Sequence, residues 1–447
     1  MSEIRNLKLT PADEGAEKSG GQSCNFWGVV KFPEELLAYI NEYKQTQSFR
    51  LNPTTGKNVV LNNQKAPIWT AFDKYIYSQN GDIKESDLPK ISATFKSCFR
   101  PYSAVAENLG MKLAMALGQP TSYNYLVSFD PEEYPEIVNN YPSIEKREKL
   151  QPYGIVSIDF LQAQHCFEKW GKADYTPPDE DTIEIDSVND LSCDELLSME
   201  DVYAHCGMRF SDSEEENYIE NWIEVVDQFA KSILKDQPRE KINKTIDRMH
   251  SRIARSFLLR EFLGDCDFTA KNTVLVYNEE LRELNYAPNH DYGEAFNPVI
   301  ENLFKKKDKY FGMTEQVFKA LPQAVQDKLA SQQPKEMSVE EVATQYASAS
   351  SERNLQYVIE NFPDASLEFF EYLDNIISKG EMERIVDSYA GLTCNGEELL
   401  KENERETLKQ FLTLRANYMC ELYVQTMEDL GIDNPFITHS SDDDLEM

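Results

Sequence analysis

The strongest constraint on the fold is a change of hydrophobic pattern along the chain. Short segments with alternating apolar and polar residues come first, and one helical stripe of apolar residues, 103–118, lies among them. From about residue 214 the apolar spacing is that of α-helices, interrupted once by two strand-like segments, 272–278 and 281–288. This order predicts an α+β fold with a small β-rich N-lobe and a large α-helical C-lobe.

Five regions are predicted from composition and pattern. A polar Gly/Ser-bearing start is interpreted as a flexible leader, and residues 171–220, with sixteen acidic and two basic side chains, as part of a surface insertion. A docking site for a basic partner is the alternative for that insertion. The regions are a leader (1–23), an N-lobe (24–165), an acidic insertion (166–220), a catalytic C-lobe (221–330) and a C-terminal helical region with an acidic tail (331–447).

The charge balance excludes some partners. With 78 acidic against 45 basic side chains the chain has a formal net charge of −33, which repels nucleic acid and anionic membranes. Its eight cysteines show no CxxC spacing, which argues against a zinc site and a disulfide framework. The start lacks the apolar core of a signal peptide, and no apolar run is long enough to span a membrane. We expect a cytoplasmic protein, with secretion by a route that needs no cleavable signal as the alternative.

A set of five residues has the order that phosphoryl transfer from a nucleotide needs. Asp267 and Asn272, spaced as D-x-x-x-x-N, place a base and an amide ligand on one loop, and Asp291 follows the strand-like pair as a second Mg²⁺ ligand. Lys96 lies in a predicted strand and Glu107 in the following helix, so an ion pair between them would direct the ammonium toward the phosphates. The predicted cofactors are therefore ATP and Mg²⁺.

Two stretches resemble the HipA-like kinase family. They are "GDCDFTAKNTVLVYN…LNYAPNHDYGEAF" and "ISATFKSCFRPYSAVAENLGMKLAMALG", about 70 residues together with the next strand. The resemblance implies a two-lobed Ser/Thr protein kinase with toxin- or effector-like biology, a protein substrate and an antitoxin as a candidate partner. It also implies Asp267 as the base, Asn272 and Asp291 as metal ligands, and Lys96 with Glu107 at the phosphates. The Asp291 segment is similar to that of phosphoinositide and actin-fragmin kinases as well.

Some positions depart from the family pattern and keep alternatives open. Phe268 and Thr269 stand where the family has Arg-His, and the phosphate loop is not recognisable, with Gly56 or the Gly20–Gly21 pair as candidates. A nucleotide-binding pseudokinase or interaction module is one alternative, and a lipid or small-molecule kinase another. Asp265 is interpreted as a turn carboxylate, although it could compete with Asp267 for the role of base; we expect its replacement to cost about 1 kcal/mol.

Overall fold

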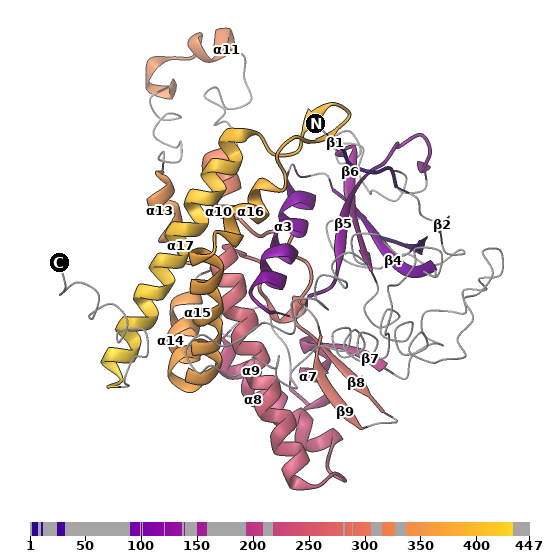
Figure 1. The fold of residues 1–447 in the computed structure, drawn as a ribbon, viewed down its shortest axis with the longest axis vertical. Coiled ribbons are helices and arrows are strands. Elements are labelled where there is room, and N and C mark those ends of the chain that lie inside the picture. The colour runs from indigo at the N-terminus through magenta and orange to yellow at the C-terminus, as the bar shows by residue number, and fades with distance from the viewer. Residues whose placement is uncertain are drawn as a thin grey trace.

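In the part of the chain that the structure describes, the computed structural model contains α-helices and three small β-sheets (Figure 1). This combination of helices and sheets is that of an α+β fold. Among the described residues, no helix is both long and apolar enough to cross a membrane. The structure describes residues 2–7, 10–11, 25–31, 90–98, 100, 102–119, 121–135, 138, 150–158, 194–208, 218–279, 282–287, 289–304, 315–326, 337–348 and 350–431.

The largest sheet is antiparallel and follows the strand pattern predicted from the sequence. In its central strand, β4, Ala93 and Phe95 are fully buried while Thr94 and Lys96 are partly exposed, as expected for a period of two. Lys96 lies opposite Asn25 and Ile155 on the two neighbouring strands. The strands, in sheet order, are β2 (Thr10–Pro11), β3 (Asn25–Lys31), β4 (Lys90–Ser97), β6 (Tyr153–Ile158) and β5 (Asn124–Ser128).

Helix α3 (Ser103–Ala116) packs between this sheet and the C-terminal helices (Figure 1). The predicted stripe of leucines is buried, and Gly118 ends the helical segment with a positive φ of 66°. On another face, Gly110 lies so close to Tyr292 that an added Cβ would come within 2.8 Å of the tyrosine Cβ. Only glycine permits this approach between α3 and the segment that carries Asp291.

The other helices form most of the remaining core (Figure 1). The apolar stripes predicted after about residue 214 are buried in α8 and α9, and a capping box formed by Ser338 and Glu341 begins α13. The longer helices are α8 (Ile219–Ile233), α9 (Arg239–Leu263), α14 (Ser351–Asn361), α15 (Pro363–Ser378) and α17 (Glu402–Asp429). Shorter helical elements are α7 (Met199–His205), η4 (Ala270–Asn272), α10 (Asn297–Val299), η5 (Ile300–Phe304), α11 (Glu315–Lys319), α13 (Val339–Ala343) and α16 (Glu381–Asp387).

Two three-stranded sheets complete the topology. The predicted pair of strands after Asn272 is present, and a third strand adds to its edge. The other small sheet joins the N-terminus to the segment before α17. The first sheet has the order β7 (Asp194–Ser198), β8 (Val274–Asn278), β9 (Glu283–Tyr286), and the second the order β1 (Ser2–Glu3), β10 (Leu392–Cys394), β11 (Glu397–Glu398).

Two of the predicted regions need correction. The flexible leader does not hold for residues 2–7, because β1 pairs with β10 and the apolar side chains of Ile4 and Leu7 are buried. The surface insertion does not hold for 194–208, because β7 pairs with β8 and Met199 and Val202 of α7 are fully buried. Residues 2–7 have too few apolar side chains to form a pattern, and the apolar side chains of 194–208 lie within a strongly acidic stretch. Both segments nevertheless contribute side chains to the core.

Some predictions fall outside the described residues. They include the candidate phosphate loops at Gly20–Gly21 and Gly56, the rest of the acidic insertion and the acidic tail. Within the predicted C-terminal helical region, the long helix α17 begins at Glu402, because β10 and β11 precede it.

Candidate functional site

Lys96 is held on the central strand between two carboxylates. Its ammonium lies 3.3 Å from the carboxylate of Glu107 on α3 and forms a closer ion pair with Asp291, 195 residues away in sequence. The side chain is 17% exposed. Burial opposes the charge of Lys96, but Asp291 and Glu107 outweigh it and raise the pKa of the ammonium above its usual value. Lys96 therefore remains a cation in the folded protein.

Glu107 is the buried partner in this set. Its side chain is only 4% exposed, and burial raises the pKa of its carboxyl while Lys96 opposes that shift. Neighbours on α3 fix the helix itself: the Asn108 amide donates to the backbone carbonyl and the side-chain oxygen of Asn124, both at 3.0 Å. The Tyr389 hydroxyl donates to Asn108 from the C-terminal region at 2.5 Å. Through Asn108, the residue after Glu107, the helix is thus tied both to strand β5 and to the C-terminal region.

Asp291 is placed by a backbone conformation and a set of anchors around it. Its φ is +60°, an uncommon value for a residue other than glycine. Just before it, the carbonyl of Asn289 accepts hydrogen bonds from Thr121 Oγ1 at 2.8 Å and Ser122 N at 2.9 Å. The Lys96 ammonium lowers the pKa of Asp291 well below the usual carboxylate range, so this side chain, 42% exposed, is ionised.

Arg260, near the end of α9, joins the Asp291 segment to the loop that carries Asp267. Its guanidinium donates to the carbonyl of Asp291 at 2.8 Å and to that of His290, and it forms an ion pair with Asp265. The helix ends in a left-handed Gly264 at φ 63°, which turns the chain directly into Asp265. A single buried cation thus holds two segments about thirty residues apart.

Asp265 is a positioning residue for the loop. It is 1% exposed, pairs with Arg260 and accepts a hydrogen bond of 3.0 Å from the backbone N–H of Asp267. The interpretation as a turn carboxylate agrees with this geometry. Because Asp265 is one member of a buried ion pair, we expect its replacement to cost roughly 3–5 kcal/mol, more than a single hydrogen bond.

Asp267 and Asn272 meet within the loop. The Asn272 side-chain amide donates to the backbone carbonyl of Asp267 at 2.9 Å, and the Asn272 oxygen accepts no hydrogen bond from the described residues. Burial, followed by the charges of Asp265 and Asp291, raises the pKa of the Asp267 carboxyl. Phe268 packs against Trp222 and Phe257, with ring centroids 5.1 and 6.1 Å away, and anchors the loop in the helical core.

All five predicted residues therefore lie along one connected series of contacts. It runs from Glu107 and Lys96 to Asp291, then through Arg260 and Asp265 to Asp267 and Asn272. Sequence reasoning missed Arg260 and Gly110. For Arg260, the available signal was a cation on the apolar stripe of a predicted helix, immediately before the Asp-rich loop. Gly110 gave no signal beyond a glycine inside a helical pattern.

Asp291 and Asn272 are the residues that could hold Mg²⁺ together with a phosphate-bearing ligand. Among the described residues no group of three or more His, Cys, Asp or Glu side chains is placed to hold a metal ion alone. Magnesium commonly takes only one or two carboxylates, completing its shell with water and substrate phosphates. The partly exposed Asp291 carboxylate and the Asn272 oxygen match that pattern.

Comparisons with known proteins give limited guidance. No family model and no curated protein matches the chain. Among solved structures, the Helicobacter pylori proinflammatory kinase CtkA is 12% identical with a TM-score of 0.40, covering 79% of this chain and 98% of that one. HipA from the Shewanella oneidensis MR-1 toxin–antitoxin complex with HipB and operator DNA is 11% identical with a TM-score of 0.36, covering 77% and 61%. Similarity at this level carries no argument about activity.

Proposed function

We propose that the chain is an ATP- and Mg²⁺-dependent phosphotransferase that acts on a protein hydroxyl. The observation that carries the proposal is the ion-paired set of Lys96, Glu107 and Asp291, drawn from a strand, a helix and a distant loop. A strand lysine oriented by a helix glutamate is the arrangement that positions nucleotide phosphates in kinases. The protein acceptor, Ser/Thr specificity and an antitoxin-like partner rest on the sequence resemblance alone.

Each residue has a distinct task in this proposal. Lys96 binds the phosphates, and Glu107 keeps its ammonium in place. Asp291 and Asn272 would hold Mg²⁺, which supplies charge neutralisation at the triphosphate when it is bound. Asp267 orients the acceptor hydroxyl and takes its proton, a task suited to a carboxylate whose pKa is raised by burial and by neighbouring Asp265 and Asp291. Arg260 and Asp265 set the geometry between these segments.

The proposal is tested by incubating purified protein with Mg²⁺ and γ-labelled ATP, alone and with a cell lysate. We expect label on the protein itself or on a lysate protein, and at least a tenfold loss in Lys96→Met. Lys235→Met is the matched control, because Lys235 is exposed and outside the site. Label on lipid or a small molecule would replace the protein acceptor. ATP binding without transfer would favour a pseudokinase, and neither binding nor transfer would overturn the proposal.

A further inference from the structure

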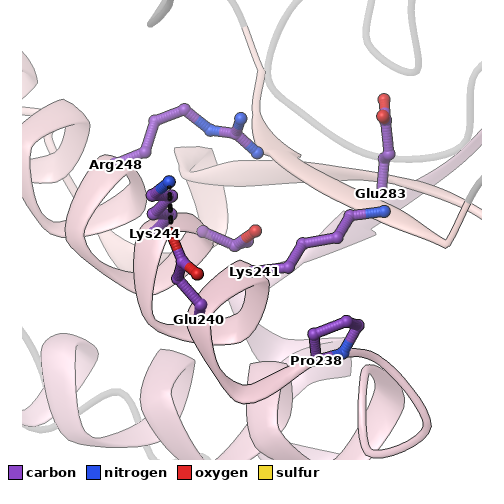
Figure 2. A pocket seen from close by; sticks show the side chains of 7 residues that line it. Pro238, Glu240, Lys241, Lys244, Arg248 and Glu283 are labelled. Carbon is purple, nitrogen blue, oxygen red and sulfur yellow. Dashed lines mark ion pairs between the residues drawn. The ribbon is translucent and has the colours of Figure 1, made fainter.

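A cavity lies at the start of α9, outside the series of contacts described above. It has a volume of about 380 Å³, within the range of small-molecule pockets. The first three turns of α9 and strand β9 contribute its walls (Figure 2). The lining residues are Pro238, Glu240, Lys241, Lys244, Thr245, Arg248 and Glu283.

Three of the five charged side chains that line the cavity are cations, although the chain as a whole is strongly acidic. Lys241, Lys244 and Arg248 lie three, four and seven positions apart along one face of α9, although acidic residues outnumber basic ones 78 to 45 overall. Lys241 forms no ion pair with another described residue. Lys244 pairs with Glu240 at 2.8 Å, but both side chains are at least 75% exposed, so this bond is weak and exchangeable.

Two groups at the inner wall have unused hydrogen-bonding capacity. Arg248 donates through Nη2 to the Leu284 carbonyl at 2.7 Å, while its buried Nε has no partner within the described part of the chain. Thr245 is only 5% exposed, and its side chain makes no hydrogen bond to any residue that the structure describes, although its hydroxyl oxygen is not fully buried. A buried donor without a partner, as Arg248 Nε is, is costly, and a bound ligand would satisfy it.

Another buried cation, Arg252, follows the cavity-lining residues along α9. Arg252, one turn beyond Arg248, is 2% exposed, contacts the Tyr286 ring at 5.7 Å and has a buried Nη2 without a partner among the described residues. No carboxylate in the described chain forms an ion pair with it. An anion near Arg248 would offset part of the cost of burying this second guanidinium.

We propose that this cavity binds a small phosphomonoester. The phosphate would contact Lys241, Lys244 and Arg248, because a dianion matches a cluster of cations, and Glu240 and Glu283 would accept hydrogen bonds from hydroxyls on the ligand body. The net charge of −33 disfavours an anionic membrane or nucleic acid as the source of the phosphate. The volume exceeds that of a bare phosphate and suits a sugar phosphate.

A ligand in the cavity would contact the β8–β9 hairpin, which lies between Asn272 and Asp291 in the sequence. Glu283 opens β9, and Leu284 beside it accepts the Arg248 hydrogen bond, so a ligand here would tie α9 more firmly to that strand. The proposal concerns binding and is independent of phosphotransfer. Its test therefore does not use enzymatic activity.

The experiment is isothermal titration calorimetry of the full chain with ribose 5-phosphate, inorganic phosphate and ribose at low salt. We expect ribose 5-phosphate to bind most tightly, inorganic phosphate more weakly and ribose not at all. Lys241→Gln and Arg248→Gln should each weaken ribose 5-phosphate binding about tenfold, as loss of a charge-assisted hydrogen bond predicts. Lys235→Gln removes the same charge from an exposed position outside the cavity and should change binding less than twofold.

Two further variants keep the outcome decisive. Lys96→Met should retain ribose 5-phosphate binding, which separates this cavity from the proposed ATP site. If Arg248→Gln fails to fold, Lys241→Gln/Lys244→Gln carries the test, because Lys244 is exposed and neither lysine makes the bond that Arg248 donates to the Leu284 carbonyl. The proposal would be overturned if neither ribose 5-phosphate nor inorganic phosphate binds. It would also be overturned if Lys235→Gln weakens ribose 5-phosphate binding as much as Lys241→Gln does.

Discussion

At the scale of single residues, the two aspartates of the loop should separate chemistry from stability. Asp267→Asn removes the proposed base and should lower phosphoryl transfer by roughly 10²–10⁴-fold while Mg²⁺-ATP binding stays nearly unchanged. Asp265→Asn leaves Arg260 buried without its partner and should cost about 3–5 kcal/mol of stability, with transfer retained in the molecules that remain folded.

Initial rates of label transfer at low temperature, normalised to the folded fraction from circular dichroism, check this pair. Asp291→Ala serves as the third variant and should weaken nucleotide binding through the metal. Transfer that survives Asp267→Asn but is lost per folded molecule in Asp265→Asn would reverse the assignment of the base.

Asp267 also gives a pH dependence whose sign follows from its surroundings. Its pKa in the folded state is raised by burial and by Asp265 and Asp291, so ionisation there opposes folding. The favourable contribution is present below the unfolded pKa and is lost as pH rises through the folded value. Asp267→Asn should therefore be more stable than the wild type at pH 7, with the difference shrinking as pH falls toward 4.5. Urea midpoints at the two pH values measure this; a larger difference at pH 4.5 would contradict it.

At the scale of elements, contact between α3 and the Asp291 segment depends on one glycine. Gly110→Ala would bring a Cβ to 2.8 Å from the Cβ of Tyr292, so α3 or the Tyr292 segment must shift, at a cost of roughly 1–3 kcal/mol. Because Glu107 lies on α3, we also expect transfer to fall more than stability alone explains. Ala114→Gly changes a buried α3 residue in the opposite direction without creating a clash. Comparable transfer per folded molecule in Gly110→Ala and the wild type would show that this contact does not position Glu107.

Much of the element order was predictable, because it depends on local periodicity. The β4 alternation, the α3 stripe and the two strands after Asn272 are visible in the sequence, and so is the spacing of Lys96, Glu107, Asp267, Asn272 and Asp291. The added strand β7 and the role of Arg260 depend on contacts between distant segments. Neither has a period or a motif of its own, so pattern reasoning assigned β7 to a surface insertion and passed over Arg260.

At the scale of the whole molecule, the acidic segment divides into parts with different expected roles. Deleting 171–190 should leave the free energy of unfolding within about 1 kcal/mol of the wild-type value, because loop closure depends weakly on length and acidic repulsion is removed. Deleting 194–208 instead removes β7 and the fully buried Met199 and Val202, and should prevent stable folding. Urea titration measures both. Equal stability of the two deletions would show that β7 and α7 do not belong to the core.

The central claim is that five residues from three separate regions of the chain form one site for Mg²⁺-ATP. These residues are Lys96, Glu107, Asp267, Asn272 and Asp291. Calorimetric titration of the full chain with ATP, with and without Mg²⁺, tests that claim most directly. We predict Mg²⁺-enhanced binding in the wild type, at least tenfold weaker binding in Lys96→Met, and loss of the Mg²⁺ enhancement in Asp291→Ala. Failure of ATP to bind the folded wild type, or binding unaffected by both substitutions, would contradict the account.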